Sequence, residues 1–232
     1  MTDELDWRKW LLDAVESDPF TEIKAPLAEM NLELLQLVAG SARSRPELSG
    51  PKSITELRPM WLEASNRMLE RLAHVPIALL DIRLQTRNPG DRADSQAHGA
   101  AELDCFRGDL GARAAVQLAH SALTLAWSLT RSSRELARVV FGLNTLTAST
   151  VAQLGIQGIQ HLAESVSHSL RLRWADRPDI WRELLHLAHQ EQHDSTSLVD
   201  MRVLQYHLAE LLQEAPKPAA TGASAENGAK RK

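Results

Sequence analysis

The sequence predicts a mainly helical protein made of two similar halves, each with one short extended segment. Leu, Ala, Gln, Glu and Arg dominate the chain, aromatic residues make up only 4%, and Val, Ile and Thr are thinly spread, which favours helices over sheets. Most apolar residues recur at helical spacing. In addition, "LAHVPIALLDIRL", beginning at Leu72, is followed ninety residues later by the similar "LAESVSHSLRLRW", beginning at Leu162. These three observations set the predicted fold class.

The first segments of the chain carry amphipathic helical patterns. Residues 4–16 place apolar residues near one helical face, and the Asp18-Pro19 pair is expected to end this helix. A second helix is expected to begin at Pro26 and to end near Gly40, because proline favours the first turn of a helix and glycine its end.

A strand is expected at the end of the first half. Ser53 is expected to cap the helix that begins there, and residues 63–74 to form the helix that follows. In "ALLDIRL" apolar and charged residues then alternate with the period of a strand. The residues expected to face inward are Leu80, Ile82 and Leu84.

The same order of patterns begins again at Ala112. Helical patterns occur in residues 114–133, 134–143, 145–154, 157–166, 179–192 and 196–213. Between the fourth and the fifth, "SLRLRW" alternates as a second short extended segment. The last helix is expected to bury one stripe, formed by Met201, Leu204, Leu208 and Leu211.

These patterns predict two repeats, a linker and a tail. The linker has no sustained period, and the tail combines Pro, Ala, Gly and Ser with a basic end. The tail is expected to be either a solvated extension or a segment attracted nonspecifically to nucleic acid. The predicted ranges are 1–88 and 111–214 for the repeats, 89–110 for the linker and 215–232 for the tail.

Composition excludes several classes of protein. A formal net charge of −4 excludes a globally basic nucleic-acid binder, although a local cationic surface is compatible with it. The single cysteine, Cys105, cannot form an internal disulfide. No apolar run reaches the ~18 residues of a membrane span, and no signal peptide is evident. We therefore expect a cytoplasmic protein without membrane contact.

The repeat is most readily explained by an internal duplication. Alignment of Leu72 with Leu162 also matches Leu80 with Leu170. In both halves a helix, a connecting helix, a short helix and a strand are expected in the same order. Two such halves would bury their apolar faces against each other about an approximate two-fold axis, as the subunits of a homodimer do. A chance match of two Leu-rich segments is the alternative.

The second half resembles the FlhD family, which partners FlhC in the master transcriptional activator of bacterial flagellar genes. The resemblance is carried by Gly142-Leu143-Asn144, by the apolar pattern that follows, and by the terminal "LRLR". Residues 26–86 are similar to a more diverged copy, and residues 111–190 form the closer one. The chain departs from the family in holding two units, and in placing Cys105 in the linker, so a covalent cross-link is not carried over.

The resemblance implies a function in transcription. It implies an all-helical, non-enzymatic subunit that binds an FlhC-like protein, forms a hetero-oligomer and acts on promoter DNA, with no cofactor. Such pairs also serve conjugative elements, so a flagellar role does not follow. A non-DNA-binding adaptor or anti-activator with the same fold is the alternative.

Candidate DNA-binding residues lie in three segments. "TVAQLGIQGIQHLAE" has the helix–turn–helix layout, and its second helix would expose Gln157 and Gln160 for base edges. It has no Lys or Arg for phosphates, and a packing role is the alternative. Residues 63–74 offer a better set, and a third group of cations could bind phosphates or pair with Glu135 and its neighbours. These further candidates are Asn66, Arg67, Arg71, Arg131, Arg134 and Arg138.

No set of catalytic residues is recognisable in the sequence. The chain has no nucleophile elbow, no glycine-rich phosphate loop and no His-Glu-x-x-His motif. His186, His189 and His193 have a spacing that could hold zinc, but they also fit an ordinary polar helix end, so no metal is expected.

Overall fold

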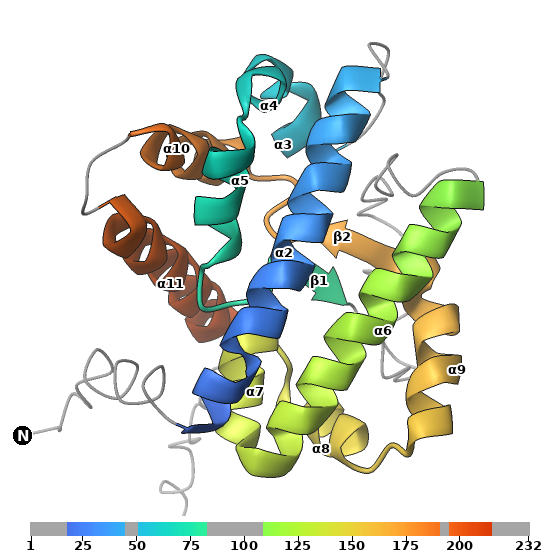
Figure 1. Cartoon of the computed structure of the whole chain (residues 1–232). Coiled ribbons are helices and arrows are strands. Elements are labelled where there is room, and N and C mark those ends of the chain that lie inside the picture. The colour runs from blue at the N-terminus through green and yellow to red at the C-terminus, as the bar shows by residue number, and fades with distance from the viewer. Residues whose placement is uncertain (1–17, 45–50, 83–108, 191–194, 215–232) are drawn as a thin grey trace, which may run out of the picture.

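The protein is mostly helical, with one two-stranded sheet between its helices (Figure 1). A computed structural model describes residues 18–44, 51–82, 109–190 and 195–214. The helical class and the two short extended segments are therefore confirmed. In these ranges no helix combines the length and the apolar character that crossing a membrane requires. The expected helix at 4–16, most of the linker with Cys105, and the basic tail lie outside the described residues.

Helix α2 (Asp18–Ser44) is longer than the sequence pattern predicted. It begins before Pro26 and continues through it, so the prediction of a helix that starts at this proline was wrong. Phe20 and Ile23 are buried and extend the apolar stripe to the turns before Pro26. Pro26 is exposed, so its ring displaces no core side chain, and burial of the first turns outweighs the lost backbone hydrogen bond.

Three short helices follow: α3 (Lys52–Thr55), α4 (Arg58–Glu63) and α5 (Asn66–Ala73). Ser53 does not cap the first of them, contrary to the sequence prediction. Its side chain is buried, and its backbone N–H donates to the carbonyl of Ala175 in the other half at 3.0 Å. Ser65 instead caps α5 by accepting a hydrogen bond from the Met68 N–H at 3.2 Å.

The second half repeats this order of elements. It consists of α6 (Asp109–Ser132), α7 (Arg134–Phe141), α8 (Thr145–Ala152), α9 (Ile156–Val166) and the 3₁₀ turn η2 (Ser167–Ser169). Side-chain caps explain two of the helix starts. Ser133 accepts from the N–H of Leu136 at 3.3 Å, and Asn144 accepts from the N–H of Thr147 at 2.7 Å.

The two strands join the halves at the centre of the molecule. Strand β1 (Leu80–Ile82) pairs antiparallel with β2 (Leu170–Leu172), with Asp81 opposite Arg171 in the middle. The outer residues of both strands are buried, as the alternating sequence pattern predicted. An antiparallel ladder has a local two-fold axis, which here passes between Asp81 and Arg171 and relates Leu80 to Leu170. The sequence alignment matches the same two leucines.

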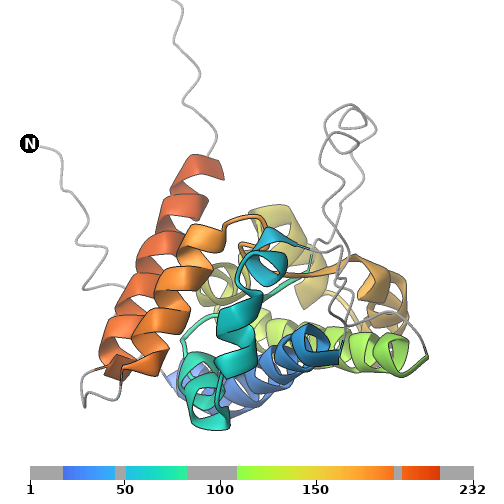
Figure 2. The same ribbon diagram turned by 90° about the horizontal axis from the view of Figure 1, so that it is seen from above.

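The long helix of each half packs on the helix that precedes the strand, and the two long helices also meet. Helix α2 packs on α5, α6 packs on α9, and α2 and α6 pack against each other (Figure 1). The last two helices, α10 (Pro178–His189) and α11 (Ser195–Glu214), lie on the side of α5 (Figures 1 and 2). One apolar core runs through both halves. In this core Trp61 of α4 packs against Trp181 of α10, with ring centroids 5.5 Å apart.

Helix α11 buries a different face from the one predicted. Val199, Val203 and His207 are buried, whereas Met201 is exposed and Leu204 is only half-buried. The prediction that Met201, Leu204 and Leu208 form the buried stripe was therefore wrong, and the side chain of Leu211 lies outside the described ones. A buried histidine held by hydrogen bonds sets the rotation of the helix, and a purely apolar pattern could not indicate this.

Candidate nucleic-acid interface

Helices α8 and α9 are joined by a short turn at Gly155, which is the order of elements that the sequence predicted. Gly155 precedes the first residue of α9 in extended conformation, and Gln157 and Gln160 are exposed on α9. Between Val139 and Gln160 the chain has no charged residue. The unit can therefore offer amide groups to a base edge, but it supplies no cation to hold a phosphate.

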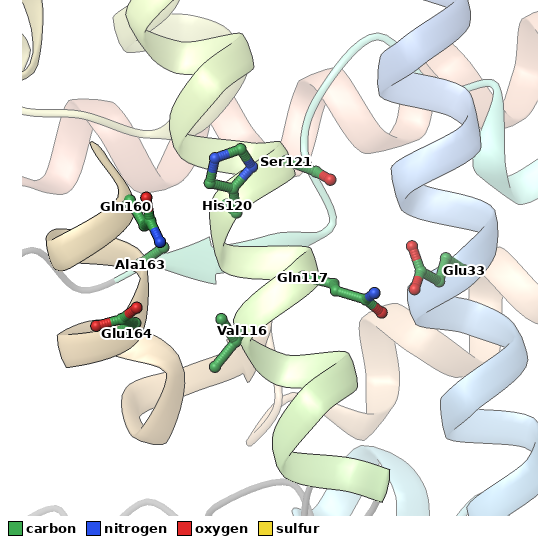
Figure 3. A pocket seen from close by; sticks show the side chains of 8 residues that line it. All are labelled: Glu33, Val116, Gln117, His120, Ser121, Gln160, Ala163 and Glu164. Carbon is green, nitrogen blue, oxygen red and sulfur yellow. The ribbon is translucent and has the colours of Figure 1, made fainter. Parts of the chain in front are cut away.

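An open groove of about 670 Å³ lies between α2, α6 and α9 (Figure 3). Gln160 lies beside His120 of α6, and Glu164 of α9 lines the same groove (Figure 3). On the other side, Glu33 of α2 and Gln117 of α6 face each other (Figure 3). Two carboxylates and no Lys or Arg line this groove, so it is unsuited to phosphate.

The three candidate residues of α5 have different surroundings. Asn66 and Arg67 are exposed at the start of the helix. Arg71, in contrast, is half-buried, and its Nη1 donates to the carbonyls of Ala188 at 2.9 Å and Gln190 at 3.2 Å. Its guanidinium group thus satisfies the C-terminal end of α10. No local sequence signal could indicate this contact, because its partners lie more than a hundred residues away.

Three arginines lie around the junction of α6 and α7, and all are exposed. The Arg131 guanidinium stacks over Trp127 at 4.9 Å from the ring centroid, and Arg138 Nε donates to the Leu143 carbonyl at 3.4 Å. Within the described ranges neither these two nor Arg134 forms an ion pair, so the pairing with Glu135 is not observed. We call Arg131, Arg134 and Arg138 the arginine row. Their geometry leaves guanidinium donors for phosphate oxygens.

The two described histidines of the suggested zinc motif, His186 and His189, lie exposed near the end of α10, and His193 lies outside the described residues. His186 Nε2 lies 3.2 Å from the side-chain nitrogen of Gln190. Across the described segments no three His, Cys, Asp or Glu residues are grouped as a metal site would require.

Sequence reasoning missed a buried polar network where α11 meets the second half. Arg173 is 5% exposed, and its Nη1 donates to His207 Nδ1 at 2.8 Å. Because arginine has no acceptor, Nδ1 must be the acceptor, so the proton is on Nε2, which donates to the Val139 carbonyl. Glu210 accepts from Trp174 Nε1 at 3.2 Å and lies 3.7 Å from His207 Nδ1. The network fastens α11 to β2 and α7.

Burial lowers the pKa of His207, and the positive charge of Arg173 acts in the same direction against the opposing effect of Glu210. The imidazole therefore stays neutral at pH 7 and can keep accepting from Arg173. Because the folded-state pKa lies below the unfolded one, the folded protein loses stability through this group as the pH falls below about 6.5.

Gly142 is required next to this network. It ends α7 with φ of +67°, in the left-handed region that favours glycine. A Cβ atom there would lie 3.1 Å from two guanidinium nitrogens of Arg173. The Gly142-Leu143-Asn144 motif thus has a structural basis: glycine ends one helix and admits Arg173, and Asn144 caps the next.

A second open cavity, of about 350 Å³, lies against the network between the sheet, α10 and α11. Trp174 (φ 55°) and Tyr206 form an aromatic wall, with ring centroids 6.1 Å apart. The Tyr206 hydroxyl donates to Glu183, which raises the pKa of that tyrosine. The charged lining mixes acids with bases and so favours neither sign of ligand: Asp81, Arg171, Asp176, Arg177 and Glu210.

Asp200 of α11 is a partly buried carboxyl group whose ionisation depends on how α11 packs. Burial raises the pKa of Asp200 to about 6, although Lys24 and His74 oppose the shift. Its Oδ1 is buried and finds no hydrogen-bond donor among the described residues. The folded protein therefore loses stability as the pH rises from about 3.8 to about 6, and the full loss persists at pH 7.

We expect Asp200→Asn to raise the free energy of unfolding by about 2 kcal/mol at pH 7.5 and to change it little at pH 4. Urea unfolding of both proteins at the two pH values measures this difference. Asp176→Asn, at an exposed position, is the control and should have little effect at either pH. An equal effect of Asp200→Asn at both pH values would contradict the buried-carboxylate explanation.

Comparison with known proteins identifies no relative: no family model, no curated protein and no solved structure matches the chain.

Proposed function

We propose that the chain is a subunit of a DNA-binding transcriptional activator complex that acts with an FlhC-like partner. The proposal starts from the resemblance of the Gly142-Leu143-Asn144 segment and its sequel to the FlhD family. It is supported by the repeated order of helices and strand, and by the antiparallel pairing of the two matched strands. A duplicated chain of this kind would replace a dimer by one polypeptide.

The observation that carries the DNA-binding part is the arginine row. Its three guanidinium groups are exposed and lack carboxylate partners within the described ranges, so they can neutralise phosphates without breaking existing ion pairs. In this proposal the complex grips DNA through backbone contacts at the α6–α7 junction, and the partner supplies further contacts. Cation contacts with phosphates contribute affinity rather than sequence choice.

The proposal predicts a salt-dependent defect for the triple variant Arg131→Gln, Arg134→Gln, Arg138→Gln. The chain is co-expressed with an FlhC-like protein of the same genome, and binding of the complex to promoter DNA is followed by fluorescence anisotropy from about 50 to about 300 mM salt. We expect affinity to fall about 10- to 100-fold at low salt, and the slope of log K against log salt to decrease by about 2 to 3.

The control neutralises three exposed cations on other parts of the chain and should leave the slope nearly unchanged. These cations are Lys52, Arg113 and Arg182. If the triple variant binds with the slope of the unaltered complex, the arginine row has no role in DNA contact. If no FlhC-like protein co-purifies and no DNA is bound, the activator proposal fails as a whole.

An adaptor without DNA contact is the second candidate, and one observation favours it. The α8–α9 unit has no Lys or Arg, and Arg71 of α5 is bound to the end of α10. A complex that forms with the FlhC-like protein, but binds DNA no better than the FlhC-like protein alone at any salt concentration, would support this candidate.

A further inference from the structure

Helices α5 and α9 hold equivalent places in the two halves. Each follows a short helix, packs on the long helix of its half and precedes the strand. The spacing is also the same, because α5 and α9 begin at Asn66 and Ile156, and their strands begin at Leu80 and Leu170. Positions along the two helices can therefore be compared one by one.

The two helices differ in what covers them. Helix α10 packs on α5, with Arg71 bound to the carbonyls at its C-terminal end. Figures 1 and 2 show α10 and α11 at one end of the molecule and α9 at the other. Among the described residues, no helix stands to α9 as α10 stands to α5.

Residues at matched positions of α5 and α9 also differ in how far they are buried. On α5 Met68 and Leu72 are buried near Arg71, and so are Ala64 before the helix and Val75 after it. The matched residues of the second half are more exposed, and the His161 side chain, which corresponds to Arg71, is 83% exposed. Two leucines and a glycine are only half-buried, and the serine is exposed: Leu154, Gly158, Leu162 and Ser165. We call these four residues with His161 the open face of α9.

Gly158 lies in the middle of the open face. It is the third residue of α9, and glycine in a helix lowers stability relative to alanine, so its presence there calls for a reason. Within 4 Å of a Cβ built at this position lie only side-chain atoms of Leu154, one turn earlier in the same chain segment, the nearest at 3.3 Å. No other described element approaches closely enough to require the missing side chain. Close approach of a second helix from outside would require it.

The charges near the open face indicate what kind of helix could dock on it. The chain has no charged residue from Val139 to Gln160, so covering the N-terminal part of the open face removes no ion from water. Leu154 and Leu162 offer apolar surface to a matching apolar stripe. His161 stands where Arg71 stands, and a histidine there can bond the free carbonyls at the end of a docked helix.

We propose that the open face of α9 is a docking site for an amphipathic helix of a partner protein, which lies on α9 as α10 lies on α5. The proposal rests on the proposed function in one respect only, because it takes the partner subunit of that complex as the natural source of the helix. DNA binding does not enter it.

The test uses a peptide with the sequence of residues 177–190, which contains α10, as the probe. The peptide is labelled at its N-terminus, and its binding to the full chain is followed by fluorescence anisotropy. In the full chain α5 is already covered by α10, so a saturable signal reports a second site. We expect saturable binding that weakens at least tenfold with Gly158→Leu and at least threefold with His161→Asp.

Gly158→Ala separates docking from folding. The added methyl group meets only the Leu154 side chain, at 3.3 Å from its terminal Cδ2 and 3.7 Å from its Cβ, and alanine favours the helix, so the melting temperature should rise by about 2 to 4 °C. Peptide binding should nevertheless weaken at least threefold. A purely structural role for this position predicts the rise without the loss of binding. This variant also keeps the test decisive if Gly158→Leu fails to fold.

Gln160→Asp is the matched control, since Gln160 is exposed on α9 but lines the groove toward α6. It should leave peptide binding within twofold of the unaltered chain. Absence of saturable binding, or binding that both Gly158 variants leave unchanged, overturns the proposal. The assay contains neither DNA nor an FlhC-like protein, so its failure is distinct from failure of the activator complex to form.

Discussion

Replacement of Asn31 by leucine is expected to lower the free energy of unfolding by about 4 kcal/mol. Asn31 is fully buried on α2, and its Nδ2 donates to the carbonyls of Ala73 at 3.2 Å and Ile77 at 2.9 Å. Its Oδ1 accepts from the Leu79 N–H at 2.9 Å. Leucine has a similar size but no polar atom, so three buried backbone groups would lose their partner, at roughly 1 to 3 kcal/mol each. Urea unfolding followed by circular dichroism measures the loss.

Gln36→Leu is the control, because Gln36 is exposed on the same helix. It should change the free energy of unfolding by less than about 0.5 kcal/mol. A loss for Asn31→Leu no larger than this would contradict the role assigned to the three hydrogen bonds.

The Asn31 contacts also show where the two halves differ. This side chain holds the connection between α5 and β1, so it positions the first strand for pairing with the second. In α6 the stretch "ALTLAWSL", from residue 122, has an apolar pattern similar to "NLELLQLV", from residue 31, and its first residue, Ala122, is buried but has no polar side chain. If the halves arose by duplication, this polar clamp belongs to only one of them.

Local signals were sufficient for most of the elements. Strict alternation predicted both strands, and helical periodicity predicted α6, α7, α8 and α9 close to their observed bounds. Caps explain why these predictions succeed, because Ser133 and Asn144 each satisfy a free N–H of the helix they precede. At such positions the local and the tertiary preferences agree.

Sequence predictions failed where a contact with a distant part of the chain determines the bounds or the orientation of a helix. Pro26 signals a helix start, yet burial of Phe20 and Ile23 carries α2 through it. The rotation of α11 depends on His207, whose partners Arg173 and Val139 lie on other elements. No pattern within α2 or α11 contains this information.

The candidate site also contains features that the sequence predicted and features that it did not. The exposure of the arginine row and of Gln157 and Gln160 followed from helical spacing alone, and the structure places them in solvent. The commitment of Arg71 to α10 did not follow, because it depends on which helix packs on α5. The open face of α9 was also hidden from the sequence, since it is defined by comparison with α5.

Replacement of Trp181 by alanine is expected to lower the free energy of unfolding by about 4 kcal/mol. The Trp181 side chain is fully buried on α10, its Nε1 donates to the Arg173 carbonyl at 2.8 Å, and its ring packs on Trp61 of α4. Alanine would leave a large cavity between the two halves and a carbonyl without its donor. Trp127→Ala is the control, because Trp127 is only half-buried, and it should cost less than half as much.

The manner of unfolding is as informative as the loss of stability. Since α10 of the second half covers α5 of the first, and one apolar core runs through both, neither half can open without exposing the other. We therefore expect the Trp181→Ala protein to unfold in a single transition that circular dichroism and tryptophan fluorescence report at the same urea concentration. Two separated transitions would mean that the halves are independently stable. In that case α10 would be a detachable cover of α5, and the comparison that defines the open face of α9 would lose its basis.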